Sequence, residues 1–340
     1  MLAFTRHLCL LFSIMAFGLP AAYADLEEGS WTLYRKKNSD QYTASFKVET
    51  NGQGTHHTTR TYQPARFKGV DLDANGRMDV SFTLETDAGT IMGEGVQRNN
   101  RATGFFAFDP DKGYFSALEK LGFEVDENTD QIGFALVDVD LDFARSVAKL
   151  DVDGMDASQL LAFKAVGGTV KFANDLRKAD IEIDNASQLV AYVVHNIDAD
   201  YIKDMRRAGF DTDKGDLVAF RVHNVTPDFI KAFRDEFGTD MALSEVLAAK
   251  IHGVTPKYLR HFKKKFPDEA ISQLVAAKIH NMSESYIEEM LDRFPNARFS
   301  ELLGAKIHGV NTRYIKRLRE KGVKTDDLDD VVALKIHGIN

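Results

Sequence analysis

Six histidines recur at nearly constant spacing in the second half of the chain. Histidine binds transition metals and titrates near neutral pH, so this spacing could serve either chemistry. A transition-metal site needs three or four converging ligands, and no carboxylate or second histidine keeps a fixed offset beside each one. Each histidine is expected in the last turn of a helix, where its imidazole can bond to free carbonyls and interact with the helix dipole. We therefore predict that the histidines cap helices and that the chain holds no metal and no other cofactor, with metal binding or pH sensing as the alternative. The histidines, separated by 28 or 29 residues, are His195, His223, His252, His280, His308 and His337.

A basic residue stands two positions before most of these histidines. One interpretation is that each cation lies near the negative end of a helix dipole and stabilises that helix. The other interpretation is a cationic stripe that repeats along one surface and binds an acidic partner. The candidate binding residues on this second interpretation are Lys250, Lys278, Lys306 and Lys335, and Lys164 and Arg221 occupy the same slot earlier in the chain.

Other groups of residues give weaker evidence for a functional site. The segment Asp71–Gly76 resembles the start of a calcium loop, but Phe82 stands where an EF-hand needs a bidentate glutamate, and Asn75-Gly76 is typical of a hairpin turn. No zinc-peptidase, serine-hydrolase, phosphate-loop or dinucleotide motif occurs. We therefore predict no catalytic residue, and interpret His56 and His57 as surface residues.

The beginning of the chain indicates export. A basic residue, an apolar run from Leu8 to Leu19 and the triplet Ala22-Tyr23-Ala24 predict a signal peptide over residues 1–24. The run is too short to cross a bilayer as a helix, so we expect no stable membrane insertion. The one cysteine, Cys9, lies in this leader, which leaves the mature chain without disulfides. A periplasmic or secreted location is expected.

Net charge limits the class of partner. The chain carries a formal charge of −8, which argues against nucleic acid as the main partner. The charge is unevenly distributed: residues 249–340 contain 17 Lys and Arg against 12 Asp and Glu, a balance of +5. The front of the protein is therefore acidic and the back is basic.

The histidine spacing defines a repeat, and each copy carries helix-start signals. Three residues after the histidine slot stands a side chain that can accept a bond from a free N–H of the first helical turn. An aromatic residue follows three positions later, with another apolar residue four further on, which places both on one helix face. These N-cap residues are Asp140, Thr169, Asp198, Thr226, Thr255, Ser283 and Asn311, the first two belonging to copies with Val137 and Val166 in the histidine slot.

A second helix precedes each histidine. The Gly or Asn after the histidine suits the left-handed residue that ends a helix. Four positions before the histidine slot the residue is always Gly or Ala, which predicts a close approach of a neighbouring helix. Two short helices cannot bury their apolar faces alone, so the copies are expected to stack as a solenoid over residues 111–340, ending in a lone capping helix.

Residues 25–110 have a different period. Apolar residues alternate with polar ones at Tyr42–Val48 and Val80–Leu84, and the segments Gly89–Val96 and Ala102–Phe108 flank an Arg98–Arg101 turn. We predict about six antiparallel strands that form a sandwich or half-barrel. Because no linker rich in Pro, Gly or Ser follows, the strands and the first repeats should pack together. The predicted fold class is α+β.

The string from Lys250 to Leu259 resembles the "IHGVTPEYI" repeat of exported bacterial proteins, and similar repeats are attached to some membrane metallopeptidase sensors of the beta-lactam-receptor type. The segments Asp87–Thr90, Gly93–Gly95 and Phe106–Phe108 are similar to the strands that precede such repeats. The resemblance implies a sensory or binding module and brings no catalytic residue.

These observations predict an exported scaffold that binds a protein or an envelope ligand, the lysine stripe favouring an acidic one. The alternative is an envelope hydrolase with its site in the β domain, which a concave cluster of perturbed carboxylates there would favour.

Overall fold

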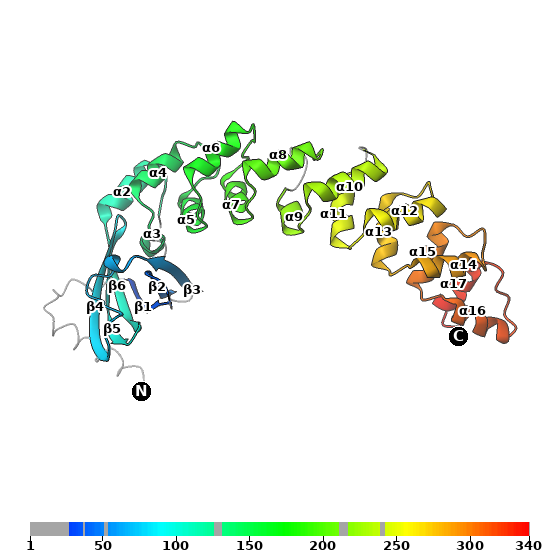
Figure 1. The fold of residues 1–340 in the computed structure, drawn as a ribbon, viewed down its shortest axis with the longest axis horizontal. Helices are drawn as coiled ribbons and strands as arrows, with labels where there is room; N and C mark the ends of the chain where they lie inside the picture. The colour runs from blue at the N-terminus through cyan, green and yellow to red at the C-terminus, as the bar shows by residue number, and fades with distance from the viewer. Residues whose placement is uncertain are drawn as a thin grey trace. The chain divides into compact units, whose positions relative to one another are not determined.

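The computed structural model describes residues 27–36, 38–50, 54–125, 131–210, 217–238 and 242–339. An antiparallel sheet is followed by paired short helices, which confirms the α+β prediction (Figure 1). The chain divides into two compact units, Met1–Val193 and Val194–Asn340, which are described separately below. The predicted signal peptide lies outside the described residues.

The sheet contains six antiparallel strands in the order β3-β2-β1-β6-β5-β4. The predicted strands and the turn at Asn99, which has a positive φ of 55°, are confirmed. The described strands form one sheet and not two stacked ones, so the sandwich alternative is wrong for this part of the chain. Their bounds are β1 (Glu27–Arg35), β2 (Tyr42–Thr50), β3 (Gly54–Tyr62), β4 (Arg77–Thr86), β5 (Gly89–Arg98) and β6 (Arg101–Pro110).

The connection between β3 and β4 covers one face of the sheet. These strands lie at opposite edges, so residues 63–76, which include the short helix η1 (Pro64–Arg66), must cross from one edge to the other. The crossing segment buries Phe67 and Leu72, and the Leu72 N–H donates to the Tyr42 hydroxyl at 3.1 Å. The hairpin interpretation of Asn75-Gly76 is therefore wrong, since the strands on either side of it are not paired.

Aromatic rings fill the covered face. The Trp31 and Phe67 rings lie 4.9 and 5.1 Å from the Phe82 ring, both edge to face. The Phe82 ring lies directly over Gly93, where an added Cβ would fall 2.1 Å from a ring carbon. Burial of these rings is the main stabilising contribution in this part of the chain.

The helices confirm the two-helix repeat. The B helices, which follow the N-cap residues, are α2 (Lys112–Lys120), α4 (Leu141–Ala148), α6 (Val170–Lys178), α8 (Ala199–Arg207), α10 (Pro227–Phe237), α12 (Pro256–Lys265), α14 (Glu284–Leu291) and α16 (Thr312–Glu320). The A helices, which end at the histidine slot, are α3 (Gln131–Val137), α5 (Ala157–Ala165), α7 (Ala186–Val194), α9 (Leu217–Val222), α11 (Leu243–Ile251), α13 (Ile271–Ile279), α15 (Phe299–Ile307) and α17 (Leu328–Ile336).

Both predicted helix signals are confirmed. All seven predicted N-cap side chains accept a hydrogen bond from the backbone N–H three residues later. The residue after each histidine slot has a positive φ, as a left-handed helix stop requires. These residues are Asp138, Gly167, Asn196, Asn224, Gly253, Asn281, Gly309 and Gly338.

Each hairpin consists of an A helix and the B helix that follows it, so the first hairpin is α3 with α4. In the first unit, the sheet packs against α2 and the first hairpin, as the absence of a linker predicted. Phe134 of α3 is buried and contacts the α2 rings of Tyr114 and Phe115. The Tyr114 hydroxyl donates to the Val139 carbonyl at 2.6 Å. The helix α3 also contacts β5 and β6. Sheet and helices therefore share one core.

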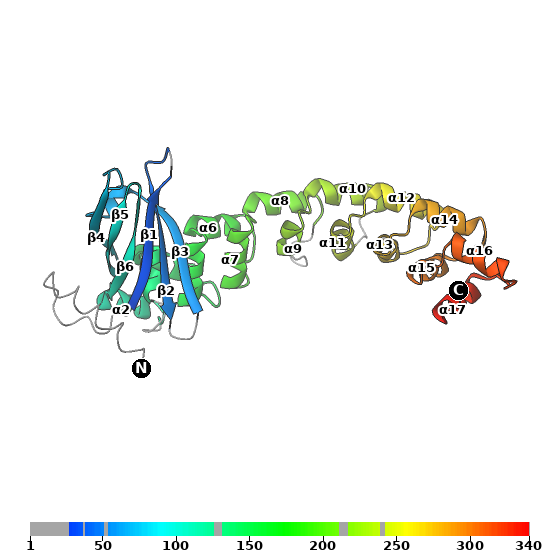
Figure 2. The same cartoon turned by 90° about the horizontal axis from the view of Figure 1, so that it is seen from below.

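In the second unit, the A helices and the B helices form two parallel rows (Figures 1 and 2). The A helices α11 and α13 contact each other directly, as do α15 and α17, and so do the B helices α10 and α12. Between the rows lie fully buried side chains such as Phe233, Leu259 and Phe262. Each hairpin thus completes its core with its neighbours.

The interpretation of the small-residue slot holds for Gly133, whose added Cβ would lie 3.0 Å from the Leu161 side chain of the neighbouring α5, but is wrong for α13 and α15. Gly304 occupies this slot in α15, and a Cβ added there would meet no atom within 4 Å. Ala276 is half-exposed, whereas the next residue, Ala277, is fully buried. In α13 and α15 the buried residue lies one position later than predicted, at Ala277 and Ala305, and the Gly/Ala slot is only partly buried.

Candidate binding surface on the helical repeats

The predicted lysines lie at one position on successive A helices, each with its ammonium over an aromatic ring of the preceding B helix. The distances to the ring centroids are 4.7, 5.1, 4.8 and 4.5 Å for the pairs Lys250–Phe229, Lys278–Tyr258, Lys306–Tyr286 and Lys335–Tyr314. Lys164 and Arg221 make the same contact with Phe143 and Tyr201. Each such contact contributes about 0.5–2 kcal/mol. The lysines therefore join consecutive hairpins, and their role in binding stays a prediction.

The same aromatic residues reach the next hairpin through their hydroxyls. Tyr258 and Tyr286 donate to the carbonyls of Met282 and Val310 at 3.3 and 3.1 Å. Burial raises the pKa of both tyrosines, so both phenols remain protonated donors at neutral pH. Each accepting carbonyl lies two residues after the histidine slot, just before the next N-cap. The aromatic residue of a B helix thus contacts the next A helix through its ring, and the turn after that A helix through its hydroxyl.

The histidines end the A helices, as predicted, but the described contacts are made by their backbone N–H groups and not by their imidazoles. His252, His280, His308 and His337 are C-cap residues, and the N–H of each donates to the carbonyl four residues before it. Their rings are exposed, and among the described residues none of the six repeat histidines makes a ring hydrogen bond to another residue. No three His, Cys, Asp or Glu side chains converge in the described part of the chain.

The aliphatic residue between the lysine and the histidine is exposed in every hairpin of the second unit. We call Val222, Ile251, Ile279, Ile307 and Ile336 the ridge; Val194 occupies the same slot. These six side chains are between 47% and 57% exposed. A large aliphatic side chain thus remains about half in water at one fixed repeat position of the second unit. The sequence shows this slot, because Ile or Val recurs there, but periodicity alone does not separate a ridge from a core position.

In the first hairpin, formed by α3 and α4, the sheet covers the corresponding slot. In α3 this residue is Leu136, which is only 2% exposed. Arg60 of the edge strand β3 donates to the Val137 carbonyl, and the Tyr62 hydroxyl donates to the Leu136 carbonyl at 3.3 Å. The outer end of the first A helix is therefore buried beneath the sheet.

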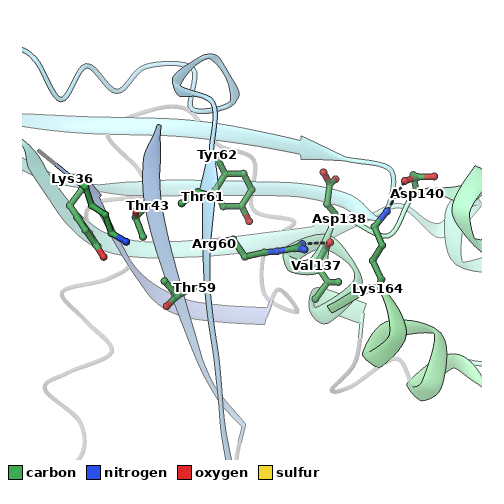
Figure 3. A pocket seen from close by; sticks show the side chains of 11 residues that line it. Lys36, Thr43, Thr59, Arg60, Thr61, Tyr62, Val137, Asp138, Asp140 and Lys164 are labelled. Atoms are coloured by element: carbon green, nitrogen blue, oxygen red, sulfur yellow. Dashed lines mark hydrogen bonds and ion pairs between the residues drawn. The ribbon is translucent and has the colours of Figure 1, made fainter. Parts of the chain in front are cut away.

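The first unit also contains an open cavity of about 670 Å³ along the β3 edge (Figure 3). Its polar groups are largely paired: Asp138 lies 3.4 Å from Arg66, and Asp140 lies 3.2 Å from Lys164. The residues that line it are Tyr34, Lys36, Thr43, Thr59, Arg60, Thr61, Tyr62, Val137, Asp138, Asp140 and Lys164.

The carboxylates of this cavity have structural partners. Burial tends to raise the pKa of Asp140, but hydrogen bonds from the Phe143 N–H and from Lys164 outweigh it and hold the pKa below its ordinary value. An aspartate with a lowered pKa stays ionised at neutral pH and cannot donate a proton as a general acid. The perturbed carboxylate cluster that would favour a hydrolase is therefore not supported by Asp140.

The calcium-loop residues also have other partners. Asp71 accepts from the Asp73 N–H at 2.9 Å, and Asp73 pairs with Arg35 at 2.5 Å. The Gln97 amide, which is completely buried, donates to the Asp71 carbonyl. This segment fixes the crossing connection to β1 and β5. His57 is exposed, as expected; the side chain of His56 is not among the described groups.

No helix in the described part of the chain has the length and apolarity needed to span a bilayer. Comparisons with protein-family models, with curated proteins and with solved structures give no match.

Proposed function

We propose that this chain is an exported scaffold protein whose helical repeats bind another protein or an envelope ligand through the ridge. The observation that supports this most strongly is the exposure of a large aliphatic side chain at one position in every hairpin of the second unit. A buried side chain at this slot would contribute fully to folding, whereas the ridge side chains leave about half of their surface in water. Apolar surface exposed in this way becomes favourable when a partner removes it from water.

The predicted lysines add to the proposal. Their ammonium groups lie next to the ridge in sequence and are held in place by the aromatic rings beneath them. A cation already fixed in position loses little conformational entropy when a partner binds. We propose that the lysines contribute to attraction of an acidic partner, in addition to joining the hairpins.

The test is affinity capture from the extracytoplasmic fraction with the mature chain as bait. The ridge variant Ile251→Ser/Ile279→Ser/Ile307→Ser should lose the captured partner, because it removes the apolar surface that the partner would take out of water. The matched control is Met78→Ser/Phe105→Ser, which removes two exposed apolar side chains from the sheet. The captured partner should then bind the purified wild-type chain and the control with equal affinity in calorimetry. Equal binding by the ridge variant would contradict the proposal.

A further inference from the structure

We infer that the ridge binds an extended acidic polypeptide of a partner protein, with an aliphatic side chain at every third residue. This inference rests on the proposed function and specifies the chemistry of its partner. Three features of the described residues lead to it: the way the first hairpin is covered, the charges beside the ridge, and the spacing of the A helices.

The first hairpin shows what fits against the outer end of an A helix. The ridge slot of α3, Leu136, is buried, and an extended segment, β3, supplies the side chains that bond to the carbonyls at that end. In the second unit the same slot is exposed in α9, α11, α13, α15 and α17. An extended chain is therefore an occupant that this helix end already accommodates once within the same protein.

The charges beside the ridge differ from those of the first hairpin. Around Leu136 the lysine slot holds Ala135 and the histidine slot holds Val137, so α3 brings no cation of its own, and Arg60 of β3 supplies one at the negative helix end. The ridge hairpins bring both a cation and a histidine. The segments from the cation to two residues past the histidine contain no Asp or Glu in Arg221–Val225, Lys250–Val254, Lys278–Met282, Lys306–Val310 and Lys335–Ile339. An occupant of the ridge should therefore carry carboxylates where β3 carries arginine.

The spacing selects the conformation of the occupant. Contacting helices have axes about 8–10 Å apart, so ridge residues should repeat at about that distance on the A helices that contact each other, α11 with α13 and α15 with α17. A polyproline II segment advances about 9.3 Å for every three residues, and thus presents one side chain to each hairpin. A β-strand presents same-side residues about 6.6–6.8 Å apart and would lose this match after one or two hairpins.

The small-residue slot leaves room for such an occupant. Gly304 and Ala276 lie three residues before Ile307 and Ile279, so each is a neighbour of a ridge residue on the same helix face. The space above Gly304 is open to 4 Å, and nothing within the protein requires a small residue there. A contact from outside accounts for the open space at Gly304, whereas at Gly133 of α3 the Leu161 side chain of the neighbouring helix already lies against the slot.

The probe is a labelled peptide of five Leu-Glu-Pro triplets, titrated into the mature chain and followed by fluorescence anisotropy. Proline favours the polyproline II conformation. We expect saturable binding that weakens as salt rises from low to physiological concentration, because the contacts include exposed charges. The variant Ile251→Ser/Ile279→Ser/Ile307→Ser should bind at least about tenfold more weakly, whereas Met78→Ser/Phe105→Ser should bind like the wild type.

Two control peptides test the chemistry. Leu-Lys-Pro triplets should bind at least about tenfold more weakly, since like charges then face each other. A peptide of unchanged composition with leucines at alternating spacings of two and four should also bind more weakly, because it cannot meet successive hairpins. Equal binding of the lysine peptide would overturn the acidic partner, and equal binding of the respaced peptide would overturn the period of three. If no peptide binds while capture from the extracytoplasmic fraction still depends on the ridge, this inference fails and the proposed function stands.

Discussion

The first hairpin and the hairpins of the second unit use one repeat pattern for two purposes. In the first hairpin the outer end of the A helix is buried beneath the sheet, with Leu136 covered and Arg60 bonded to the Val137 carbonyl. In the second unit the same end is open, and Ile251 and its counterparts remain about half-exposed. A shared backbone pattern therefore does not imply a shared surface role.

The two regions also differ in how neighbouring elements are joined. The second unit relies on a repeated aromatic slot, in which one ring holds a lysine and one hydroxyl reaches a carbonyl. The first hairpin uses long-range contacts with the sheet, made by residues far away in sequence such as Tyr62 and Phe134. The contacts of the second unit join neighbouring repeats at a fixed sequence spacing, whereas those of the first hairpin join residues that only the tertiary structure brings together.

The largest expected effect comes from removing the ring that joins the first hairpin to its surroundings. Phe134→Ala leaves a cavity in the core of the first unit and should lower its free energy of unfolding by about 3–5 kcal/mol. Hydrogen exchange followed by mass spectrometry should show faster exchange in the sheet and in α3, with exchange in α12–α17 unchanged. The mirror variant Phe262→Ala should give the opposite distribution. Loss of protection in both units with either variant would remove the distinction between them.

A smaller effect is expected at the covered helix end. Arg60→Met removes the charged donor to the Val137 carbonyl and should cost about 1.5–3 kcal/mol in urea unfolding of the first unit. The matched control is Arg98→Met at the exposed β5–β6 turn, which should cost less than about 0.5 kcal/mol. If both variants unfold alike, Arg60 does not hold the sheet against α3.

The aromatic slot of the second unit allows a reciprocal test. Tyr286→Phe loses the hydroxyl bond to Val310 and should destabilise by about 0.5–1.5 kcal/mol. Phe229→Tyr adds a hydroxyl in the one hairpin of the second unit that has phenylalanine there, and should stabilise through the Val254 carbonyl. Thermal unfolding measures both. A lower melting temperature for Tyr286→Phe and a higher one for Phe229→Tyr would support the same aromatic geometry in both hairpins. A lower melting temperature for both variants would contradict it.

The smallest expected effect concerns two glycines in one slot. Gly304→Ala should stabilise the second unit by about 0.5–1 kcal/mol, since alanine is the better helix former and the added Cβ meets open space. Gly133→Ala should gain less, because its Cβ would lie 3.0 Å from a methyl carbon of Leu161. Circular dichroism melting of the two variants compares them. Destabilisation by Gly304→Ala would show that a helix packs there after all.

Short-range features of this protein were predictable from its sequence. Thr255 and Asn311 are N-caps because a side-chain oxygen can bond to a free N–H only three residues away, and Gly253 ends a helix because it adopts a positive φ without strain. The repeat length, the helix boundaries and the strands with alternating burial follow from the same local rules. The spacing of the sequence predicts the candidate lysines and the aromatic residues separately, but it does not predict that each lysine lies over an aromatic ring.

Only the tertiary structure decided which faces are covered. The order of the six strands places β3 and β4 at opposite edges, and no local signal shows that the segment between them crosses the sheet. The face on which the Gly/Ala slot lies in α13 and α15 is not predictable from the sequence, because a period of 3.6 residues leaves adjacent helix positions 100° apart, and Ala276 and Ala277 cannot be distinguished without the neighbouring helix. Likewise Leu136 and Ile279 occupy one repeat position, yet one is buried and the other exposed. Burial depends on which elements meet in space, and the sequence of a single repeat does not contain that information.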